Sequence, residues 1–427
     1  MERQYDVIVI GGGPSGLMAS VSAAQLGARV LLIDKGSKLG RKLAISGGGR
    51  CNVTNRADTE EIIKHIPGNG RFMYSPFSVF DNEDIIDFFE NLGISLKEED
   101  RGRMFPVNDK AITVVRTLLE QIRTLNVDIR TETGVADVLY DHAAGKVTGV
   151  KLTSGSEISA PNVIVAVGGK SVPHTGSTGD GYPWAKKAGH TVTDLYPTEV
   201  PITCSDSLIR DKTLQGLSLR DIELSVVDPK KKKAIKTHDG DMIFTHFGIS
   251  GPAALRCSQY VVKALKKHKC TAIPLEVNLF PGKRENDVIE DITSIVEAEP
   301  KKAIKNSLAG WVPERMLNAL FVLTETDPQT TQANLSKEAI RSLAQHSLAF
   351  PLQADGTLSI EKAFVTGGGV SIKEIQPKRM ESKLMHGLFF CGEVLDLHGY
   401  TGGYNITVAF STGYTAGKAA AENLWEE

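Results

Sequence analysis

The first 34 residues hold the feature that most restricts the fold of this chain. A short apolar run, Tyr5–Ile10, leads into the glycine-rich stretch GGGPSG. A helical pattern follows over Leu17–Leu26, and a second apolar run ends at Asp34. Short β-branched runs of this kind are typical of buried parallel strands, which need a helix to connect them. The sequence therefore predicts a βαβ unit here, and with it a doubly wound α/β domain.

Within this unit the glycine spacing is that of a dinucleotide fingerprint. Gly11, Gly13 and Gly16 satisfy G-x-G-x-x-G between a predicted strand and a predicted helix. The first glycine permits the tight turn, the second lets the backbone approach a pyrophosphate, and the third lets helix and strand pack closely. The helix N-terminus also attracts phosphates. Asp34 is placed to accept hydrogen bonds from an adenosine ribose, which favours FAD or NAD over NADP; the fingerprint does not choose between these two.

The composition of the chain limits the classes of protein and of partner that need to be considered. The chain has 427 residues, 41% of them hydrophobic and 23% charged, which is typical of a soluble protein of two or three domains. Its net charge of −2 predicts no general attraction for nucleic acid or an anionic membrane. The first residues do not resemble a signal peptide and no apolar run is long enough for a membrane span, so a cytoplasmic location is expected. Five cysteines without a CxxC pair predict no disulfide framework and no metal site.

A change of pattern predicts an inserted domain. Short strand patterns dominate residues 191–280, helical patterns follow over 281–350, and strands with glycine loops return afterwards. We therefore predict a discontinuous first domain, residues 1–190 and 351–427, around an insert at 191–350. The insert contains the run Lys230–Lys233 after an Asp-Pro pair. No aromatic residues interleave with these lysines, so the run is interpreted as a solvated turn.

Four longer motifs carry a resemblance to a known family. They are GRKLAISGGGRCNVTN at 40–55, FTHFGISGP at 244–252, VTGGGV at 365–370 and GLFFCGEVLDLHGYTGGYN at 387–405. Together they resemble, over essentially the whole chain, the bacterial flavoprotein family that includes aminoacetone oxidase and the BaiN-type bile-acid enoyl reductases. The resemblance implies a glutathione-reductase-like FAD domain with an insert of a different kind, and non-covalently bound FAD as the cofactor.

The resemblance also implies which residues hold FAD. The loop after the second strand would lie along the pyrophosphate and reach toward the flavin, with Gly47–Gly49 keeping the main chain flat against it. The last helix would point its N-terminus at the flavin pyrimidine, where reduced flavin carries negative charge. Beyond the three fingerprint glycines and Asp34, the predicted cofactor-binding residues are Pro14, Ser15, Lys35, Arg41, Lys42, Ser46, Gly47, Gly49, Arg50, Cys51, Asn52, Val135, Gly168, Gly169, Gly392, Glu393, Asp396, Gly403, Tyr404, Asn405 and Ile406.

Among these residues, polar contacts are expected from Ser46 and Asn52, charge compensation of the phosphates from Arg41, Lys42 and Arg50, and packing under the ring from Cys51. Val135 is expected to contact adenine through its backbone.

The predicted activity is that of a FAD-dependent oxidoreductase that transfers hydride through flavin N5. NAD(P)H-dependent reduction of a small organic substrate is preferred, although no second G-x-G-x-x-G is present, so the nicotinamide would dock transiently. Three alternatives stay open: an amine oxidase that uses oxygen, a flavin-dependent tRNA-modifying protein, which the net charge disfavours, and a non-catalytic flavin-binding protein. His246, His398 and Tyr400 are candidates for handling substrate protons, and no catalytic residue is assigned. The sequence does not indicate the oligomeric state.

Overall fold

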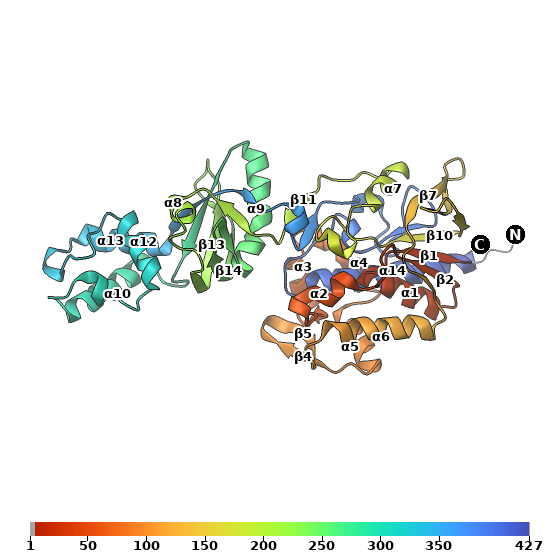
Figure 1. The fold of residues 1–427 in the computed structure, drawn as a ribbon, viewed down its shortest axis with the longest axis horizontal. Helices are drawn as coiled ribbons and strands as arrows, with labels where there is room; N and C mark the ends of the chain where they lie inside the picture. Colours follow the sequence, from red (N-terminus) through yellow and green to blue (C-terminus); the bar gives the residue numbers. More distant parts are fainter. Residues whose placement is uncertain (1–4, 427) are drawn as a thin grey trace. The chain divides into compact units, whose positions relative to one another are not determined.

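The computed structural model describes residues 5–426, which form two compact units (Figure 1). The first unit runs up to Tyr196 and resumes at Ile360, and the second is Pro197–Ser359. The chain therefore leaves the first unit once and returns to it. The described chain contains no helix with both the length and the apolar character needed to cross a bilayer.

A five-stranded parallel sheet forms the core of the first unit. Its order is β19 (Leu388–Phe390), β10 (Asn162–Val165), β1 (Val7–Ile10), β2 (Val30–Ile33) and β6 (Asp128–Arg130). The chain builds outward from β1 to β2 and β6, and later adds β10 and β19 on the other side of β1. In such a doubly wound sheet, ligands bind outside the carboxyl ends of the strands, where the strand order reverses. The predicted fold class is confirmed.

Two helices pack closely on this sheet. Glycines of α14 (Tyr404–Glu426) face α1 (Pro14–Gln25): a Cβ added to Gly413 would lie 2.2 Å from the carbonyl oxygen of Ser15, and one added to Gly417 would lie 2.1 Å from that of Ala19. From the first contact to the second, the position moves toward the C-terminus on both helices, so α1 and α14 run parallel. Only glycine allows so close a crossing, and this crossing fixes where the N-terminus of α14 lies relative to that of α1.

Smaller elements complete the first unit. Helix α5 (Asn82–Asn91) begins with a capping box at Asp81, and a hairpin turns at Arg101–Gly102. The other elements are α2 (Arg41–Gly49), β3 (Thr54–Asn55), α3 (Thr59–Lys64), α4 (Tyr74–Phe77), β4 (Leu96–Glu99), β5 (Arg103–Pro106), α6 (Ala111–Thr124), β7 (Val135–Asp141), β8 (Lys146–Leu152), β9 (Glu157–Ser159), α7 (Gly181–Lys187) and β18 (Val365–Gly367). Strand β11 (Tyr196–Thr198) lies at the boundary of the two units.

The second unit contains a closed barrel. Its strand order is β12 (Ile202–Cys204), β15 (Gly248–Ser250), β14 (Ala234–Phe244), β13 (Ser218–Val227), β16 (Ile273–Asn278) and β17 (Phe350–Thr357). Strand β17 pairs with both β12 and β16 and so closes the barrel. The chain therefore returns to the first unit at Ile360, later than residue 350, where the sequence pattern placed the end of the insert.

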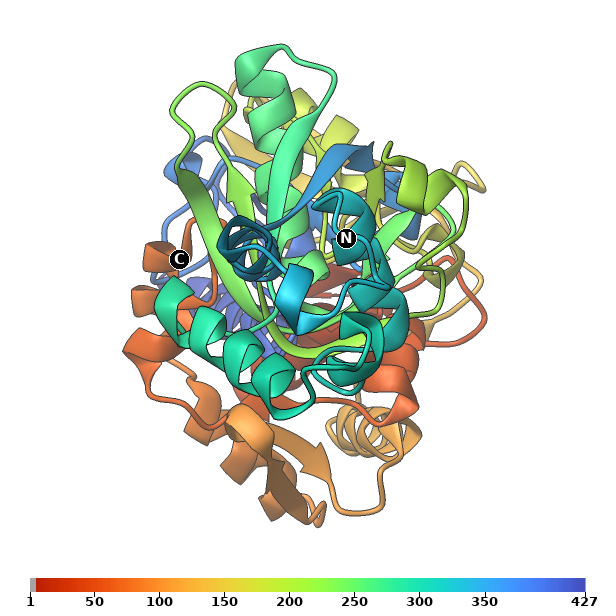
Figure 2. The ribbon, with the colours of Figure 1, turned by 90° about the vertical axis from the view of Figure 1, so that its left-hand side faces the viewer.

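Helices accompany the barrel. The 17-residue helix α9 (Pro252–His268) interrupts the stretch in which strand patterns dominate, and its buried face packs on the barrel strands. The helical part holds α10 (Glu285–Ala298), α11 (Ile304–Ser307), α12 (Glu314–Leu323) and α13 (Lys337–Leu348), which Figure 2 shows in teal and blue; α8 (Ser207–Arg210) is a single turn.

Candidate cofactor-binding site

The three fingerprint glycines have different surroundings. A Cβ on Gly11 would lie 2.5 Å from the carbonyl oxygen of Ala166, and one on Gly16 would lie 1.8 Å from the carbonyl oxygen of Gly11. These two positions therefore exclude any side chain. A Cβ on Gly13 would meet no atom within 4 Å, so the start of α1, where Pro14 is the first helical residue, faces open space. The backbone N–H groups of this first turn are available to a ligand there.

Asp34, directly after β2, ties two loops together. One carboxylate oxygen accepts a hydrogen bond from the backbone N–H of Gly12 at 2.8 Å, and the other accepts one from the N–H of Gly36 at 2.7 Å. The guanidinium of Arg41 lies 3.9 Å away. Each carboxylate oxygen has a second lone pair. Asp34 can therefore hold the fingerprint loop in place and still accept hydrogen bonds from ribose hydroxyls. The backbone N–H of Thr133, two residues before Val135, donates to the carbonyl of Asp34 at 3.0 Å.

The triple glycine breaks α2 into a left-handed segment. The helix is regular only to Ile45, and then Gly47, Gly48 and Gly49 take φ values of 55°, 69° and 87°. Added Cβ atoms on Gly48 and Gly49 would meet nothing within 4 Å. Residues with side chains rarely adopt this backbone conformation. The run therefore presents bare main chain to open space, where a flat ligand can lie against it.

Asn52 holds an unsatisfied acceptor near this run. The residue is only 8% exposed, and its Oδ1 atom is buried without a hydrogen-bond partner. That atom lies 3.0 Å from the position that a Cβ on Gly403 would occupy. A buried carbonyl oxygen without a donor costs about 1–3 kcal/mol, so a ligand N–H or O–H group is a fitting partner. Ser46, in contrast, uses its hydroxyl on the carbonyl of Leu43 at 2.7 Å.

The start of α14 is shaped by its own side chains. The amide of Asn405 accepts from the N–H of Gly399 and donates to its carbonyl, both at 2.8 Å, and thereby fixes the preceding loop. The ring of Tyr404 stacks on His65 with centroids 4.6 Å apart. Gly403 has a φ of 97°, and its carbonyl accepts the first helical hydrogen bond, from Thr407. The backbone N–H groups of the first turn, through Ile406, remain the groups that this helix offers a ligand.

The N-termini of α1 and α14 point in the same direction. Ser15 meets Gly413, and Tyr404 precedes Gly413 by nine residues. With a rise of 1.5 Å per residue, the start of α14 extends about 12 Å beyond the start of α1 in the same direction. Arg41, at the start of α2, lies by Asp34, and Asn52, just after the glycine run, lies by Gly403. Positive helix ends and bare backbone thus line an elongated path from Asp34 to α14.

Lys42 and Glu393 form an ion pair within this region. Lys42 Nζ lies 2.7 Å from the carboxylate of Glu393 and 2.9 Å from the hydroxyl of Ser171. Glu393 also accepts from Ser171 at 2.8 Å and from the N–H of Thr366 at 2.9 Å. Burial raises the pKa of Glu393, but the charge of Lys42 and these hydrogen bonds outweigh it and hold that pKa below its usual value. Sequence reasoning did not name Ser171, which lies outside the quoted motifs, or Thr366, which lies within VTGGGV but was not singled out.

Arg50 is directed elsewhere. Its guanidinium forms ion pairs with Glu99 and Asp109 and lies over the ring of Phe105, 4.3 Å from the centroid. Two carboxylates thus already balance its charge, which makes it unsuited to the predicted compensation of phosphates. Lys35 is likewise paired, with Asp180 at 2.5 Å.

Other predicted site residues are required by packing. Added Cβ atoms on Gly168, Gly169 and Gly392 would lie 2.7, 2.4 and 2.5 Å from the hydroxyls of Ser177, Thr366 and Ser15, respectively. The N–H of Asp396 donates to the carbonyl of Val370 at 2.9 Å. Cys51 is fully buried, and burial raises its pKa to about 12. The thiol is therefore a packing group and not a nucleophile at neutral pH.

The candidates for proton handling belong to both units, His398 and Tyr400 to the first and His246 to the second. His398 is 1% exposed; its ring lies edge-on to Tyr196, with centroids 5.8 Å apart, and occupies the space that a Cβ on Gly68 would need. Tyr400 is also buried, at 3% exposure. His246 belongs to the second unit and lies exposed in the turn between β14 and β15. Their surroundings assign a catalytic role to none of these side chains.

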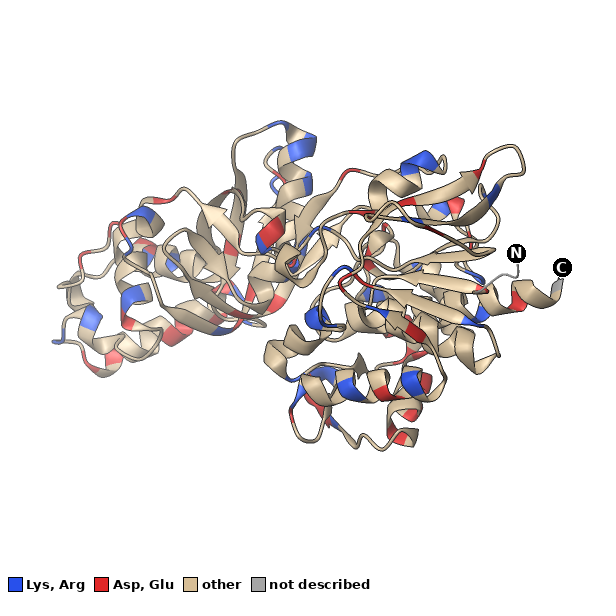
Figure 3. Cartoon of the chain, turned by 45° about the vertical axis from the view of Figure 1, so that its right-hand side comes forward, with Lys and Arg blue, Asp and Glu red and all other residues tan. Residues whose placement is uncertain are grey.

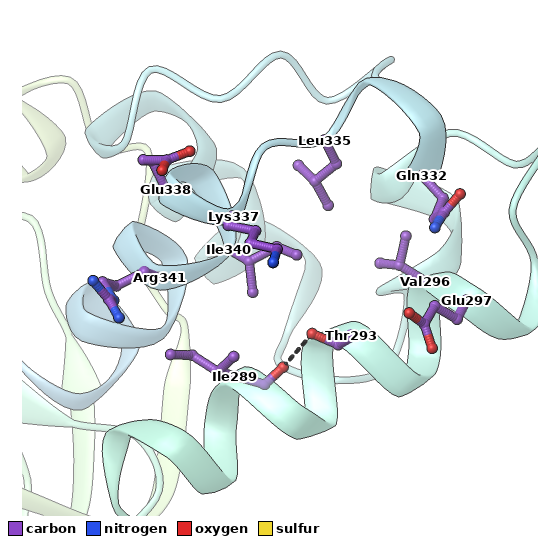
Figure 4. Close-up of a pocket in the computed structure, with 10 residues that line it drawn as sticks. All are labelled: Ile289, Thr293, Val296, Glu297, Gln332, Leu335, Lys337, Glu338, Ile340 and Arg341. Atoms are coloured by element: carbon purple, nitrogen blue, oxygen red, sulfur yellow. Dashed lines mark hydrogen bonds between the residues drawn. The ribbon is translucent and has the colours of Figure 1, made fainter.

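The second unit contains a separate hollow of about 480 Å³ between α10 and α13 (Figure 4). Apolar side chains of Ile289, Val296, Leu335 and Ile340 line it together with charged ones at its edge. None of the predicted site residues lies there.

The doubly wound sheet is a dinucleotide-binding fold, and the family and relatives of this chain identify it as a FAD-dependent oxidoreductase. Residues 5–419 match the family described as HI0933-like protein Rossmann domain, and the chain belongs to that family, which confirms the resemblance drawn from its motifs. The chain is 32% identical over 426 residues to a ribosomal RNA dihydrouridine synthase of Escherichia coli (strain K12), covering 99% of this chain and 98% of the relative. It is 28% identical over 416 residues to a 3-dehydro-bile acid delta(4,6)-reductase of Clostridium scindens, covering 97% and 98%.

Solved structures agree on the fold. A 3-ketosteroid delta1-dehydrogenase from Sterolibacterium denitrificans superposes with a TM-score of 0.53 at 12% identity, covering 98% of this chain and 99% of that one. A flavocytochrome c3 fumarate reductase superposes with a TM-score of 0.50 at 17% identity, covering 99% and 78%. At such identities the likeness concerns the fold alone.

The residues present fit FAD. The open space before Gly13 and over Gly48 and Gly49, the orphaned oxygen of Asn52 and the two parallel helix ends suit a ligand with phosphates at one point and a flat polar ring further along. In this arrangement Asp34 would hold the ribose, the start of α1 the pyrophosphate and the first turn of α14 the ring.

Proposed function

We propose that this protein is a FAD-dependent reductase that adds two hydrogens across a carbon–carbon double bond conjugated to a carbonyl, with uridine in ribosomal RNA as its substrate and NAD(P)H as its electron donor. The observation that carries this proposal is the near full-length similarity to two ribosomal RNA dihydrouridine synthases, at 32% and 31% identity. Dihydrouridine is uridine with two hydrogens added to the ring double bond. The bile-acid relative is named as a reductase as well.

The site residues support reduction of this kind. Bound FAD would supply the hydride, and the chain would stabilise the charge that reduced flavin carries. Helix α14 runs parallel to α1, and the positive end of its dipole lies at Tyr404–Ile406. The flavin ring would lie at this helix end, where the positive potential stabilises the negative charge of reduced flavin. The groups that donate hydrogen bonds at this helix end are backbone N–H groups. Stabilising the reduced flavin therefore requires no change of protonation in the side chains of the first turn. The ion pair of Lys42 with Glu393 holds the start of α2 against the turn that follows β19.

The donor has no fingerprint of its own. G-x-G-x-x-G occurs once at a strand-to-helix turn, and that turn suits FAD. A nicotinamide would therefore bind briefly and leave before the substrate enters. This order of events predicts ping-pong kinetics, with parallel double-reciprocal lines when NADH is varied at several fixed RNA concentrations.

The test uses the purified holoprotein without oxygen. NADH or NADPH is added and the flavin absorbance is followed, and then ribosomal RNA transcribed in vitro is added and digested for mass spectrometry. We expect bleaching of the flavin, its reoxidation by RNA and the appearance of dihydrouridine. Peroxide formation from an amine without bleaching by either nicotinamide would point instead to an amine oxidase. Reoxidation by small enones but not by RNA would indicate a reductase of small molecules, and no reduction by any donor would indicate a non-catalytic flavoprotein.

A further inference from the structure

A turn rich in lysine lies beside a helix end in the second unit. Strands β13 and β14 are joined by the stretch Asp228–Lys233, which contains four consecutive lysines. The carboxylate of Asp228 accepts hydrogen bonds from the backbone N–H groups of Lys230 and Lys231, both at 2.9 Å. The same carboxylate lies 3.3 Å from Nε2 of His268, the last residue of α9. The turn and the helix end are therefore held side by side by one acidic residue.

This arrangement gathers positive charge. The lysine surface comprises eight exposed lysines of the turn, of β14 and of the end of α9, in the region where Figure 3 shows basic residues along that helix. They are Lys230, Lys231, Lys232, Lys233, Lys236, Lys266, Lys267 and Lys269. Asp228, the acid that joins the two segments, is 7% exposed and is used by the turn itself. Within residues 5–426, the four side chains of Lys230–Lys233 have no carboxylate at ion-pair distance.

The charge is local and is not a property of the whole chain. The net charge is −2, so its sum over the chain predicts no attraction for polyanions. An extended surface of one sign nevertheless attracts phosphates strongly, because each neutralised phosphate releases condensed counterions. Four adjacent ammonium groups on one turn, with more on a neighbouring helix end, suit a repeating row of phosphates better than a single small anion.

The chemistry of this surface favours a nucleic acid backbone over a membrane. Peripheral membrane helices combine lysines with bulky apolar residues that enter the lipid. Here the exposed large apolar side chain next to the lysines is Ile235 alone, among the described residues. Aromatic side chains for base stacking do not alternate with the lysines either, so the surface is suited to phosphates and carries no base readout.

We propose that the lysine surface binds the phosphate backbone of the ribosomal RNA substrate. This proposal rests on the proposed function, which supplies RNA as the partner, and assigns the insert a role in holding RNA that is separate from the chemistry at the flavin. The contacts are electrostatic and do not depend on base sequence.

The test replaces Lys230, Lys231, Lys232 and Lys233 by Gln in the full-length holoprotein. The backbone N–H groups that Asp228 binds stay in place, so the turn keeps its shape. A matched control replaces four exposed lysines elsewhere, Lys146, Lys151, Lys301 and Lys305, by Gln, which gives the same change in net charge. Filter binding to a ribosomal RNA fragment is measured over a range of salt concentrations, and reduction of the flavin by NADH is measured in parallel.

We expect the RNA affinity of the turn variant to fall at least about tenfold near 0.1 M salt. The slope of log K against log salt should become shallower by about 0.7–0.9 for each phosphate that the variant no longer neutralises. The control should keep both the affinity and the slope, and both variants should keep NADH-driven flavin reduction. Equal RNA affinity for the turn variant and the wild type would overturn the proposal. Lysine-dependent binding to phosphatidylserine vesicles without binding to RNA would also overturn it.

The two proposals fail separately. If the wild type binds RNA through the lysine surface but forms no dihydrouridine, the proposed reaction is wrong and the RNA surface stands. If the wild type forms dihydrouridine and the turn variant binds RNA equally well, the surface is wrong and the reaction stands.

Discussion

Replacing Gly13 by alanine separates cofactor binding from folding. Gly13 is the N-cap of α1 with φ −80° and ψ −176°, a conformation that alanine adopts without strain, and its Cβ would meet nothing within 4 Å. Alanine at an N-cap costs roughly 0.5 kcal/mol relative to glycine, and the smaller freedom of the unfolded chain returns about 0.4–1 kcal/mol. The stability of the FAD-free protein should therefore change by less than about 1 kcal/mol.

The effect on FAD should be much larger. The added methyl group occupies the space in which a pyrophosphate would approach the start of α1. Losing one charge-assisted hydrogen bond costs about 1.5–3 kcal/mol, which raises the dissociation constant of FAD on the order of tenfold to a hundredfold. The apoprotein is titrated with FAD and followed by flavin fluorescence, and its unfolding is followed by circular dichroism.

Two further variants serve as controls. Gly16→Ala places a Cβ 1.8 Å from the carbonyl oxygen of Gly11, so it should destabilise the apoprotein itself. Gly356→Ala, in the barrel, meets only a Thr203 hydroxyl at 3.3 Å and should leave FAD affinity unchanged. A wild-type dissociation constant in Gly13→Ala would refute the idea that the phosphates approach this residue. A large drop in apoprotein stability would refute the inference that the space before it is open.

Three more predictions follow from the same region. Asp34→Ala should weaken FAD binding about tenfold to a hundredfold, because it removes the predicted ribose acceptor; an unchanged dissociation constant by fluorescence titration would contradict that role. The folded-state pKa of Glu393 is depressed, so its pair with Lys42 should stabilise the protein above the unfolded-state pKa of about 4.3 and lose this contribution as the pH falls through the folded-state value; denaturation from pH 7 to 3 should show a flatter acid dependence for Glu393→Gln. Iodoacetamide at pH 8 should modify the partly exposed Cys270 and spare Cys51, whose pKa is raised to about 12; rapid labelling of Cys51, detected by peptide mass spectrometry, would contradict its burial.

Local patterns were sufficient for the fingerprint and the family. The strand, turn and helix around Gly11–Gly16 are contiguous, and the spacing of their glycines is that of a known local motif. The same holds for the capping box at Asp81 and for the hairpin at Arg101–Gly102, where a few neighbouring residues decide the conformation. The run Gly47–Gly49 was expected to keep the main chain free of side chains, and the left-handed backbone found there is one that few other residues adopt.

The partners of charged side chains could not be predicted in this way. Arg50 follows the glycine run and was expected beside phosphates, yet the fold brings Glu99 and Asp109 to it from 49 and 59 positions away in the chain. Lys42 meets Glu393, which is 351 positions away. Charge alone does not choose among many possible partners, because the choice depends on which segments the fold brings together.

What the sequence alone determined is thus the βαβ start, the dinucleotide chemistry and the family, all of which rest on residues that act over a short stretch of chain. Only the tertiary structure decided that α1 and α14 run parallel, that β17 closes the barrel and that the lysine turn lies beside the end of α9. Each of these depends on contacts between distant segments, which form when buried surfaces pack together. The net charge of −2, which is a sum over the whole chain, disfavoured a polyanionic partner. The local surface of eight lysines forms only when folding brings the turn and the end of α9 together.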